Sequence, residues 1–466
     1  MSNQVQALVV GAGISGLTTA YALQKADIST VIVEAASRPG GLIQSVQREG
    51  FLLECGPQSF SGNFSLTAVC RDLNLLDERV LADPKAPRYV LIDGKLQNVP
   101  MGPGLLGSPL MGGGTRGAIL RDIFGSSRAP ETDESVAQFT RRKFSATLLE
   151  RLVGPFVSGV YAGDPEKLSL RAAFPILHEA EVASGSVVRG MFPAMKQRRV
   201  KRGNTPREKP TLQTFRQGNE TLIRALAAHL GERLICGVEV TSLEPLNNGR
   251  RLPNAPRFRV TLRTSRGEEK LETERLILAV PTNVAGKLLA PLHPAFQSEL
   301  GPVEYAGVAV VSLGYRKVDV GHLLSGFGFL VPRSSGLSVL GTVWNSSLFP
   351  GRAPEGYALL TSFVGGATNP AAIRKPPEEL VSQVHGEIAP LLAIRNQALF
   401  SNVTIWPRAL PQYNLGHTSR LAALEKLRSQ FPGLHFAGNY LNGPAIGACV
   451  EYALKVADEI RVSFAN

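Results

Sequence analysis

Three glycines, Gly11, Gly13 and Gly16, have the spacing that can hold the phosphates of a dinucleotide. They follow a short apolar stretch, residues 5–10, and open a stretch with helical spacing, residues 14–25. At such a turn the first glycine allows a tight bend, the second lets the backbone approach a pyrophosphate, and the third lets the helix pack closely on the strand. The free N–H groups at the start of the helix attract the phosphates. The residues predicted to bind the dinucleotide here are Gly11, Ala12, Gly13, Ile14, Ser15 and Gly16.

A carboxylate follows at the position that would meet a ribose. Glu34 ends the β-branched stretch at 29–33 and comes 21 residues after Gly13. Its oxygens can accept hydrogen bonds from ribose hydroxyls, and its charge would repel the 2′-phosphate of NADP. Residues 38–41, Arg-Pro-Gly-Gly, let the backbone run beside a second phosphate or a ribityl chain, which favours FAD over NAD. The predicted cofactor contacts in this stretch are Glu34, Ala35, Arg38, Gly40, Gly41 and Leu42.

The same succession of strand, glycine turn and helix returns near the C-terminus. Residues 434–438 are typical of a short strand, residues 443–447 form a glycine-containing turn, and residues 448–462 have helical spacing. The start of this second helix would lie near the flavin ring, so both ends of the chain would share one FAD. The predicted contacts here are Gly438, Asn439, Gly443, Pro444, Ala445 and Ile446.

The elements between these ends indicate an α/β protein. Residues 232–280 and 306–365 are rich in apolar, β-branched stretches that predict strands, whereas residues 135–160 have helical spacing. A stretch rich in glycine and proline, residues 100–130, could be an insertion with an exposed apolar face. A chain of 466 residues is long enough for two or three structural units.

Composition narrows the possible partners. The net charge is +12, and residues 196–209 carry seven positive residues and one negative residue, half of the excess. No aromatic residues interleave with these charges, which disfavours nucleic acid and favours an anionic lipid surface or an acidic substrate. The four cysteines are widely spaced, and no metal site is expected. We find no signal or transit peptide and no stretch of about 20 apolar residues, so a cytoplasmic protein is expected.

The combined pattern resembles the flavin amine oxidase superfamily and, within it, the oxygen-dependent protoporphyrinogen oxidases. The resemblance covers nearly the whole chain, and its internal motifs are more specific than the glycine spacing. The motifs that carry it are Glu54 through Phe60, Arg88-Tyr89-Val90, Ser158 through Pro165, Lys167-Leu168-Ser169, Gly326-Phe327-Gly328, Gly341-Thr342-Val343, Ser346 through Pro350, Gly365 through Thr368, and Trp406 with Pro411-Gln412-Tyr413.

The resemblance implies an oxidoreductase of porphyrin and heme biosynthesis. Such enzymes oxidise protoporphyrinogen IX to protoporphyrin IX by hydride transfer to flavin N5, and O2 reoxidises the flavin to give hydrogen peroxide. It also implies a Rossmann-like FAD domain, a mixed-sheet substrate domain and an inserted helical domain that associates with a membrane. The corresponding ranges are 1–76, 235–290 and 405–466 for FAD, 77–94, 183–234 and 291–404 for the substrate, and 95–182 for the helices.

Individual residues carry over from the resemblance. Arg88 would pair with a propionate, and the backbone at Gly159 would face the porphyrinogen centre. Apolar walls around the tetrapyrrole would come from Phe327, Leu330, Val343 and Phe363. Further cofactor contacts implied are Gly56, Pro57, Gln58, Ser59, Val240 and Trp406, with Tyr413 nearby. Gln58 differs from the asparagine of plant-like members and the basic residue of animal ones. No catalytic His, Asp or Cys is predicted, because the flavin carries the chemistry.

Several alternatives remain at this stage. Relatives on the same scaffold oxidise coproporphyrinogen III to coproporphyrin III, and other flavin oxidases act on amines or carotenoids. A flavin-binding protein with an inactive pocket at a lipid surface is a third possibility. We also expect association with an anionic membrane surface and allow for a homodimer.

Overall fold

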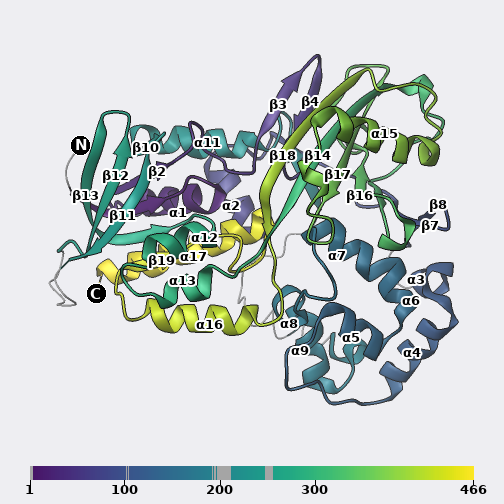
Figure 1. Cartoon of the computed structure of the whole chain (residues 1–466), viewed down its shortest axis with the longest axis horizontal. Coiled ribbons are helices and arrows are strands. Elements are labelled where there is room, and N and C mark those ends of the chain that lie inside the picture. The colour runs from purple at the N-terminus through teal and green to yellow at the C-terminus, as the bar shows by residue number, and fades with distance from the viewer. Residues whose placement is uncertain are drawn as a thin grey trace.

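The computed structural model describes residues 4–246 and 255–465, apart from 101, 103, 192, 194, 195 and 197–210. The predicted basic run at 196–209 therefore lies, except for Lys196, outside the described residues. Within the described part, two large sheets and a group of helices form three regions of the molecule (Figure 1).

The first sheet is built around the N-terminal strand. Its strands run in the order β10 (Leu234–Cys236), β2 (Thr30–Glu34), β1 (Gln4–Val10), β13 (Gly267–Leu278), β12 (Phe258–Thr264) and β11 (Glu239–Pro245), and β19 (Leu434–Phe436) pairs with β13. The strands from β10 to β13 and β19 are parallel, whereas β11, β12 and β13 are antiparallel. The parallel part agrees with the predicted dinucleotide-binding unit.

Helices cover both faces of this sheet, which explains why its central strands are apolar throughout. Ala7 and Val9 of β1 pack in one cluster with residues of α1 (Ile14–Lys25) and α17 (Ile446–Ala465). Leu8 and Val10 pack in another, on the opposite face. The first face is also covered by α2 (Phe64–Asp72) and α11 (Glu220–Leu230). The opposite face is covered by α12 (Thr282–Leu289), α13 (Ala295–Leu300) and α16 (His417–Arg428).

The second sheet is mixed. Its strands run in the order β18 (Phe400–Pro411), β14 (Tyr305–Arg316), β17 (Tyr357–Gly365), β16 (Val339–Val343), β15 (Gly328–Leu330), β7 (Arg88–Ile92) and β8 (Lys95–Asn98). Only β15 and β7, among these described pairs, run parallel. Helix α15 (Pro377–Leu392) covers one face, where Leu360, Val364 and Phe329 pack against it (Figure 1). The opposite face of this sheet is not covered by α15.

Two small sheets connect these regions. One is the hairpin of β3 (Ser45–Arg48) and β4 (Phe51–Glu54). The other has the order β5 (Phe60–Ser61), β9 (Leu212–Phe215) and β6 (Arg79–Leu81). A short helix, α14 (Asn345–Leu348), lies between β16 and β17.

The third region is a group of helices between β8 and β9 (Figure 1). Its helices with printed bounds among the described residues include α3 (Gly104–Gly107), α4 (Gly112–Phe124), α5 (Val136–Lys143), α6 (Ala146–Leu148), α7 (Gly154–Tyr161), α8 (Leu170–Ala173) and α9 (Pro175–Ser184). Because β8 belongs to the second sheet, the helices begin at Gly104, after the predicted start of the insertion at 95. The predicted domain boundaries otherwise stay a prediction. Among the described residues, no helix is both long and apolar enough to cross a bilayer.

Candidate functional site

The glycine turn leaves open space at the start of α1. Gly11 has φ +99°, and a Cβ there would lie 2.6 Å from the carbonyl oxygen of Ala279. A Cβ at Gly16 would lie 1.9 Å from the carbonyl oxygen of Gly11, so only glycine allows α1 to approach so closely. A Cβ at Gly13 would meet no atom within 4 Å. Packed glycines on both sides of an open one fit a phosphate that occupies the space beside Gly13.

Glu34 connects the end of β2 to this turn. Its carboxylate accepts hydrogen bonds from the backbone N–H groups of Ala12 (2.7 Å) and Ala36 (2.9 Å). Each oxygen keeps a lone pair for a further donor, so Glu34 can still accept from a ribose hydroxyl. The N–H of Val238 donates to the Glu34 carbonyl at 2.9 Å, which brings the start of β11, and so Val240, beside the same site.

The stretch from Arg38 to Leu42 lies against the glycine turn. The N–H of Gly40 donates to the carbonyl of Ala12 at 2.7 Å, and Gly13 and Gly40 form an isolated parallel bridge. The Arg38 guanidinium donates to the carbonyls of Pro39 and Gly41 at 3.1 and 2.8 Å. Arg38 therefore shapes the loop, and its contribution to cofactor binding comes through the backbone that it holds.

The predicted contacts at 56–59 follow β4 and lie against the other side of the stretch from Arg38 to Leu42. A Cβ at Gly56 would lie 2.0 Å from the carbonyl oxygen of Leu42, so the two backbones touch. The indole N–H of Trp406 donates to the carbonyl of Cys55 at 2.6 Å. Gln58 is buried, donating to the carbonyl of Gly56 at 2.9 Å. The structure thus brings Leu42, residues 55–58 and Trp406 together across more than three hundred residues of chain.

The C-terminal glycine turn is fixed by Tyr413. Its hydroxyl donates to the carbonyl of Asn439 and accepts from the N–H of Gly443, at 2.7 Å for the latter. Just beyond the turn, α17 begins beside α1, since Cys449 of α17 forms a side-chain hydrogen bond with Ser15 of α1. Burial raises the pKa of the Cys449 thiol to about 11, and this hydrogen bond opposes the rise. The N-termini of α1 and α17 therefore meet, and their sharing of one FAD stays a prediction.

The predicted substrate residues Leu330, Val343 and Phe363 share the face of the second sheet that α15 does not cover. Leu330 lies opposite Gly341, and Gly341 lies opposite Phe363. Residues directly opposite each other in a ladder point to the same face, and Val343 points the same way because it comes two residues after Gly341. Leu330 and Phe363 are only half-buried, although they lie on central strands of the sheet.

This face extends from residues 54–58, which we call the flavin loop, to the cation Arg88. Trp406 lies opposite Val308, and both pack with Phe363 in one apolar cluster. Phe363 also packs with Val343 and Phe327 in a second cluster. Arg88 begins β7 beside Phe327, and its guanidinium carbon lies 5.7 Å from the centre of the Phe327 ring. We call this surface, from Trp406 through Phe363 to Arg88, the apolar face.

Helix α7 closes over the apolar face at Gly159. A Cβ on Gly159 would lie 2.4 Å from Cδ2 of Leu330. The helix ends just after it, at Tyr161, with Ala162 in the left-handed region at φ 48°. Gly159 therefore sets how closely this helix approaches Leu330, and the role of its backbone toward a porphyrinogen stays a prediction.

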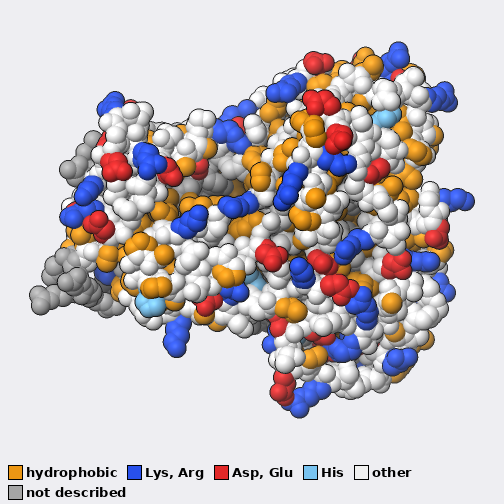
Figure 2. All heavy atoms as spheres, viewed as in Figure 1, with side chains coloured by type: hydrophobic (Ala, Val, Ile, Leu, Met, Phe, Trp, Pro, Cys, Tyr) orange, Lys and Arg blue, Asp and Glu red, His pale blue; other side chains and the backbone are white. Residues whose placement is uncertain are grey.

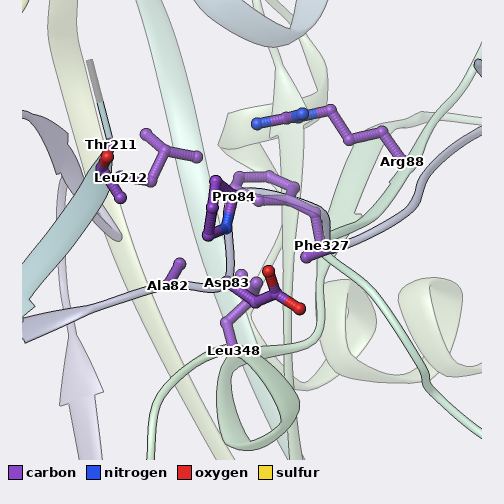
Figure 3. Close-up of a pocket in the computed structure, with 9 residues that line it drawn as sticks. Ala82, Asp83, Pro84, Arg88, Thr211, Leu212, Phe327 and Leu348 are labelled. Atoms are coloured by element: carbon purple, nitrogen blue, oxygen red, sulfur yellow. The ribbon is translucent and has the colours of Figure 1, made fainter. Parts of the chain in front are cut away.

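A cavity of about 110 Å³ lies beside Arg88. Figure 3 shows Arg88 and Asp83 on opposite sides of Pro84 and Phe327. The other residues that line this cavity are Ala82, Ala86, Thr211, Leu212 and Leu348. Drug-sized ligands fill pockets of about 300–1,000 Å³, so this cavity fits one arm of a larger molecule. A carboxylate arm matches the guanidinium.

Sequence reasoning missed the role of two polar residues near these sites. Asp83 lies in the cavity wall, but nothing in its neighbourhood in the sequence distinguishes it from an ordinary loop acid. Arg352 is buried and pairs with Glu54, yet no local pattern links residues so far apart.

The comparisons with known proteins agree with this geometry. Residues 14–461 match the family described as flavin containing amine oxidoreductase. The chloroplastic protoporphyrinogen oxidase of Nicotiana tabacum is 38% identical over 481 residues, which cover 98% of this chain and 85% of the relative. The coproporphyrinogen III oxidase of Bacillus subtilis is 28% identical and is covered to 95%, as is this chain.

The fold is also shared with solved structures. A protein of Exiguobacterium sp. 255-15, provisionally named a protoporphyrinogen oxidase, superposes with a TM-score of 0.80 at 24% identity over 99% of both chains. A putrescine oxidase variant superposes with a TM-score of 0.71 at 17% identity, again over 99% of both chains. These structures show the shared fold, and the matched family and the Nicotiana tabacum relative show that the chain belongs to the flavin-containing amine oxidoreductase family and, within it, to the protoporphyrinogen oxidases.

Proposed function

We propose that this chain oxidises protoporphyrinogen IX to protoporphyrin IX with FAD and O2, releasing hydrogen peroxide, as a step of porphyrin and heme biosynthesis. The observation that carries the proposal is the apolar face, which runs from Trp406 beside the flavin loop to the cation Arg88. A flat, apolar substrate with carboxylate arms matches such a surface. The name of the Nicotiana tabacum relative supports the same reaction.

The residues of this chain would bind and orient the substrate. Bound FAD accepts the electrons that the substrate loses as hydride and passes them to O2. Phe363 and Leu330 would pack on the macrocycle, and Arg88 would hold a carboxylate arm. The backbone carbonyl of Gly159 would accept from a pyrrole N–H.

Coproporphyrinogen III is the second candidate substrate. The Bacillus subtilis relative, named a coproporphyrinogen III oxidase, favours it, although at lower identity. Two features of the cavity favour protoporphyrinogen, which has two carboxylates instead of four. The cavity is small, and Asp83 contributes a negative charge opposite Arg88.

Anaerobic reduction of the bound flavin tests the proposal. The purified holoprotein is mixed with protoporphyrinogen IX, coproporphyrinogen III or an amine, and bleaching of the flavin absorbance is followed. We expect the fastest bleaching with protoporphyrinogen IX and fluorescent protoporphyrin on admission of air. Faster bleaching by coproporphyrinogen would favour the second candidate, and bleaching by the amine alone would indicate an amine oxidase. A flavin that none of them reduces would indicate a binding protein without this activity.

We further propose that the helical region contacts an anionic membrane surface. Its helices expose large apolar side chains, among them Leu120 (56%) and Phe124 (81%) of α4. Figure 2 shows Lys and Arg interspersed with Asp and Glu over the visible face, so charge alone does not mark the contact there. Flotation with vesicles containing anionic lipid tests it. Leu120→Asp/Phe124→Asp should reduce co-flotation, whereas Leu323→Asp, at a residue 92% exposed outside these helices, should not.

We also propose a cytoplasmic location and allow for a homodimer. Cell fractionation tests the location: activity in the cytosolic and peripheral-membrane fractions would support it, and activity in a separate compartment would contradict it. Light scattering of the purified holoprotein tests the dimer by its mass. A mass of about 50 kDa would show a monomer, since the chain has a mass of 49.9 kDa.

A further inference from the structure

A buried ion pair joins the flavin loop to the second sheet. Arg352 and Glu54 are 2% and 3% exposed, and Nη1 of Arg352 lies 2.8 Å from Oε1 of Glu54. The two residues are 298 positions apart in the chain. Burying both charges costs several kcal/mol in a typical protein, to order of magnitude, and is tolerated when further hydrogen bonds satisfy the pair.

Those further bonds are present around Glu54. Its carboxylate accepts from the Ser45 hydroxyl at 2.6 Å and from the backbone N–H of Asn219 at 3.0 Å. Burial raises the pKa of Glu54, and Arg352 and these two donors oppose the rise. A Cβ at Gly218, which has φ +91°, would lie 2.3 Å from the Ser45 hydroxyl oxygen. No larger side chain fits there without displacing the donor.

The other end of the guanidinium closes a ring. Arg352 donates to the hydroxyl of Thr214 and to the carbonyl of Phe215, the latter at 3.5 Å. Thr214 donates to the side-chain oxygen of Asn219 at 2.9 Å, and Asn219 Nδ2 donates to the carbonyl of Pro57 at 2.7 Å. The network begins at Glu54 and returns to the chain at Pro57, on either side of Cys55 and Gly56.

The network also reaches the proposed substrate cavity through the chain itself. Arg352 comes four residues after Leu348, which lines the cavity beside Arg88. The backbone carbonyl of Arg352 accepts from the N–H of Leu52 in β4 at 3.1 Å. Asn345, on the same short helix as Leu348, donates to Gln58 at 2.6 Å. The flavin loop and the α14 segment are therefore fixed to each other by side chains and backbone.

We propose that Arg352 is a positioning residue, which acts through Glu54 and Asn219 to hold residues 55–57 against the flavin and in register with the α14 segment. The inference rests on the proposed flavin site at 56–59. Among the described residues, Arg352 has no hydrogen bond to Trp406, Phe363 or Arg88, and its guanidinium carbon lies 5.9 Å from the centre of the Phe349 ring, which packs beside the apolar face. Arg352 therefore acts on the position of residues 55–57.

Arg352→Met tests this by removing the charge while keeping a long side chain. We expect the dissociation constant of FAD to rise about 10- to 100-fold, the range found when a residue that orients a metal ligand is lost. We also expect a shifted flavin absorption band and a higher KM for porphyrinogen in the flavin-saturated protein. Arg352→Lys keeps the charge but cannot bond Glu54 and Thr214 together, and should show the same changes at about a third of the size or less. If Arg352→Met fails to fold, the FAD affinity, flavin band and KM of Arg352→Lys test the proposal.

Lys143→Met is the matched control. Lys143 pairs with Asp122 at 2.6 Å, and the two side chains are 7% and 1% exposed, but the pair lies among the helices. Lys143→Met should lower the unfolding temperature and leave the flavin spectrum and the FAD affinity unchanged. The double variant Glu54→Gln/Arg352→Met removes the unpaired charge, so it should recover stability while the flavin band stays shifted.

The outcomes separate a positioning role from a structural one. If Arg352→Met and Arg352→Lys lose stability but keep the wild-type flavin band, FAD affinity and KM, the inference is overturned. In that case bleaching of the wild-type flavin by porphyrinogen would leave the proposed function intact. A wild-type chain that binds no FAD would overturn both.

Discussion

The glycine turn and the apolar face are built in opposite ways. The turn uses consecutive residues and mostly backbone atoms: Gly11, Gly13 and Gly16 define it within six positions. The apolar face uses side chains from separate strands, brought together only by sheet register, as Phe363 and Trp406 are. We infer that the cofactor site tolerates little change in backbone packing, whereas the substrate site tolerates changes one side chain at a time.

The largest effect should come from Gly16→Ala. The added Cβ would lie 1.9 Å from the carbonyl oxygen of Gly11, and neither backbone can move without separating α1 from β1. We expect a loss of about 3 kcal/mol or more in the free energy of unfolding, with no flavin retained on purification. Thermal unfolding and the ratio of flavin to protein absorbance measure both. A stable yellow variant would show that the turn is less closely packed than described.

Gly13→Ala should separate binding from folding at the same turn. The new Cβ meets no protein atom within 4 Å, and Gly13 already has an extended conformation, φ −69° and ψ 175°, open to alanine. We expect the flavin-free variant to unfold within about 1 kcal/mol of wild type, since a cap position is changed. FAD should bind about 10- to 100-fold more weakly, because the methyl group occupies the phosphate space. Urea unfolding and FAD titration test it, and unchanged FAD affinity would place the phosphates elsewhere.

These two glycines show what sequence can predict. The order of residues 5–34 was sufficient for the strand, turn and helix, because each contact there is local. The proximity of Gly56 to Leu42, and of Tyr413 to the turn at Gly443, required the family resemblance or the fold itself. The pairing of Arg352 with Glu54 has no signal in the sequence, because a buried ion pair carries no periodic pattern, and only the fold shows it.

Arg88→Met should have the next largest effect, on the apolar face. Removing the guanidinium takes away the partner of a substrate carboxylate while the methionine still packs on Phe327. We expect KM for protoporphyrinogen to rise about 10- to 100-fold with FAD affinity unchanged, given about 1.5–3 kcal/mol for a hydrogen bond to a charged group. Lys95→Met, an exposed cation on neighbouring β8, is the control and should leave KM unchanged. Equal KM values in the two variants would remove Arg88 from the substrate site.

Gly159→Ala tests whether α7 is part of the same surface. The Cβ would lie 2.4 Å from Cδ2 of Leu330, the end of a flexible side chain that can rotate aside at some cost. We expect KM to rise about three- to tenfold, with flavin content and spectrum unchanged, as for overpacking of about 1 kcal/mol. Gly163→Ala is not a suitable control, because its Cβ would meet Gln412. Gly117→Ala, where nothing lies within 4 Å, is suitable and should behave as wild type. A changed flavin spectrum in Gly159→Ala would mean that α7 acts on the cofactor instead.

The smallest effect should come from Asp83→Asn, and it concerns the choice between the two porphyrinogens. Asp83 is exposed, so solvent weakens its repulsion of a carboxylate near Arg88. We expect kcat/KM for coproporphyrinogen to rise about two- to fivefold relative to protoporphyrinogen, since the tetracarboxylate feels the lost charge more. High salt should reduce the difference between the variant and wild type. If the ratio of the two substrates stays constant at low salt, Asp83 has no part in selection, and the size of the cavity must account for any preference.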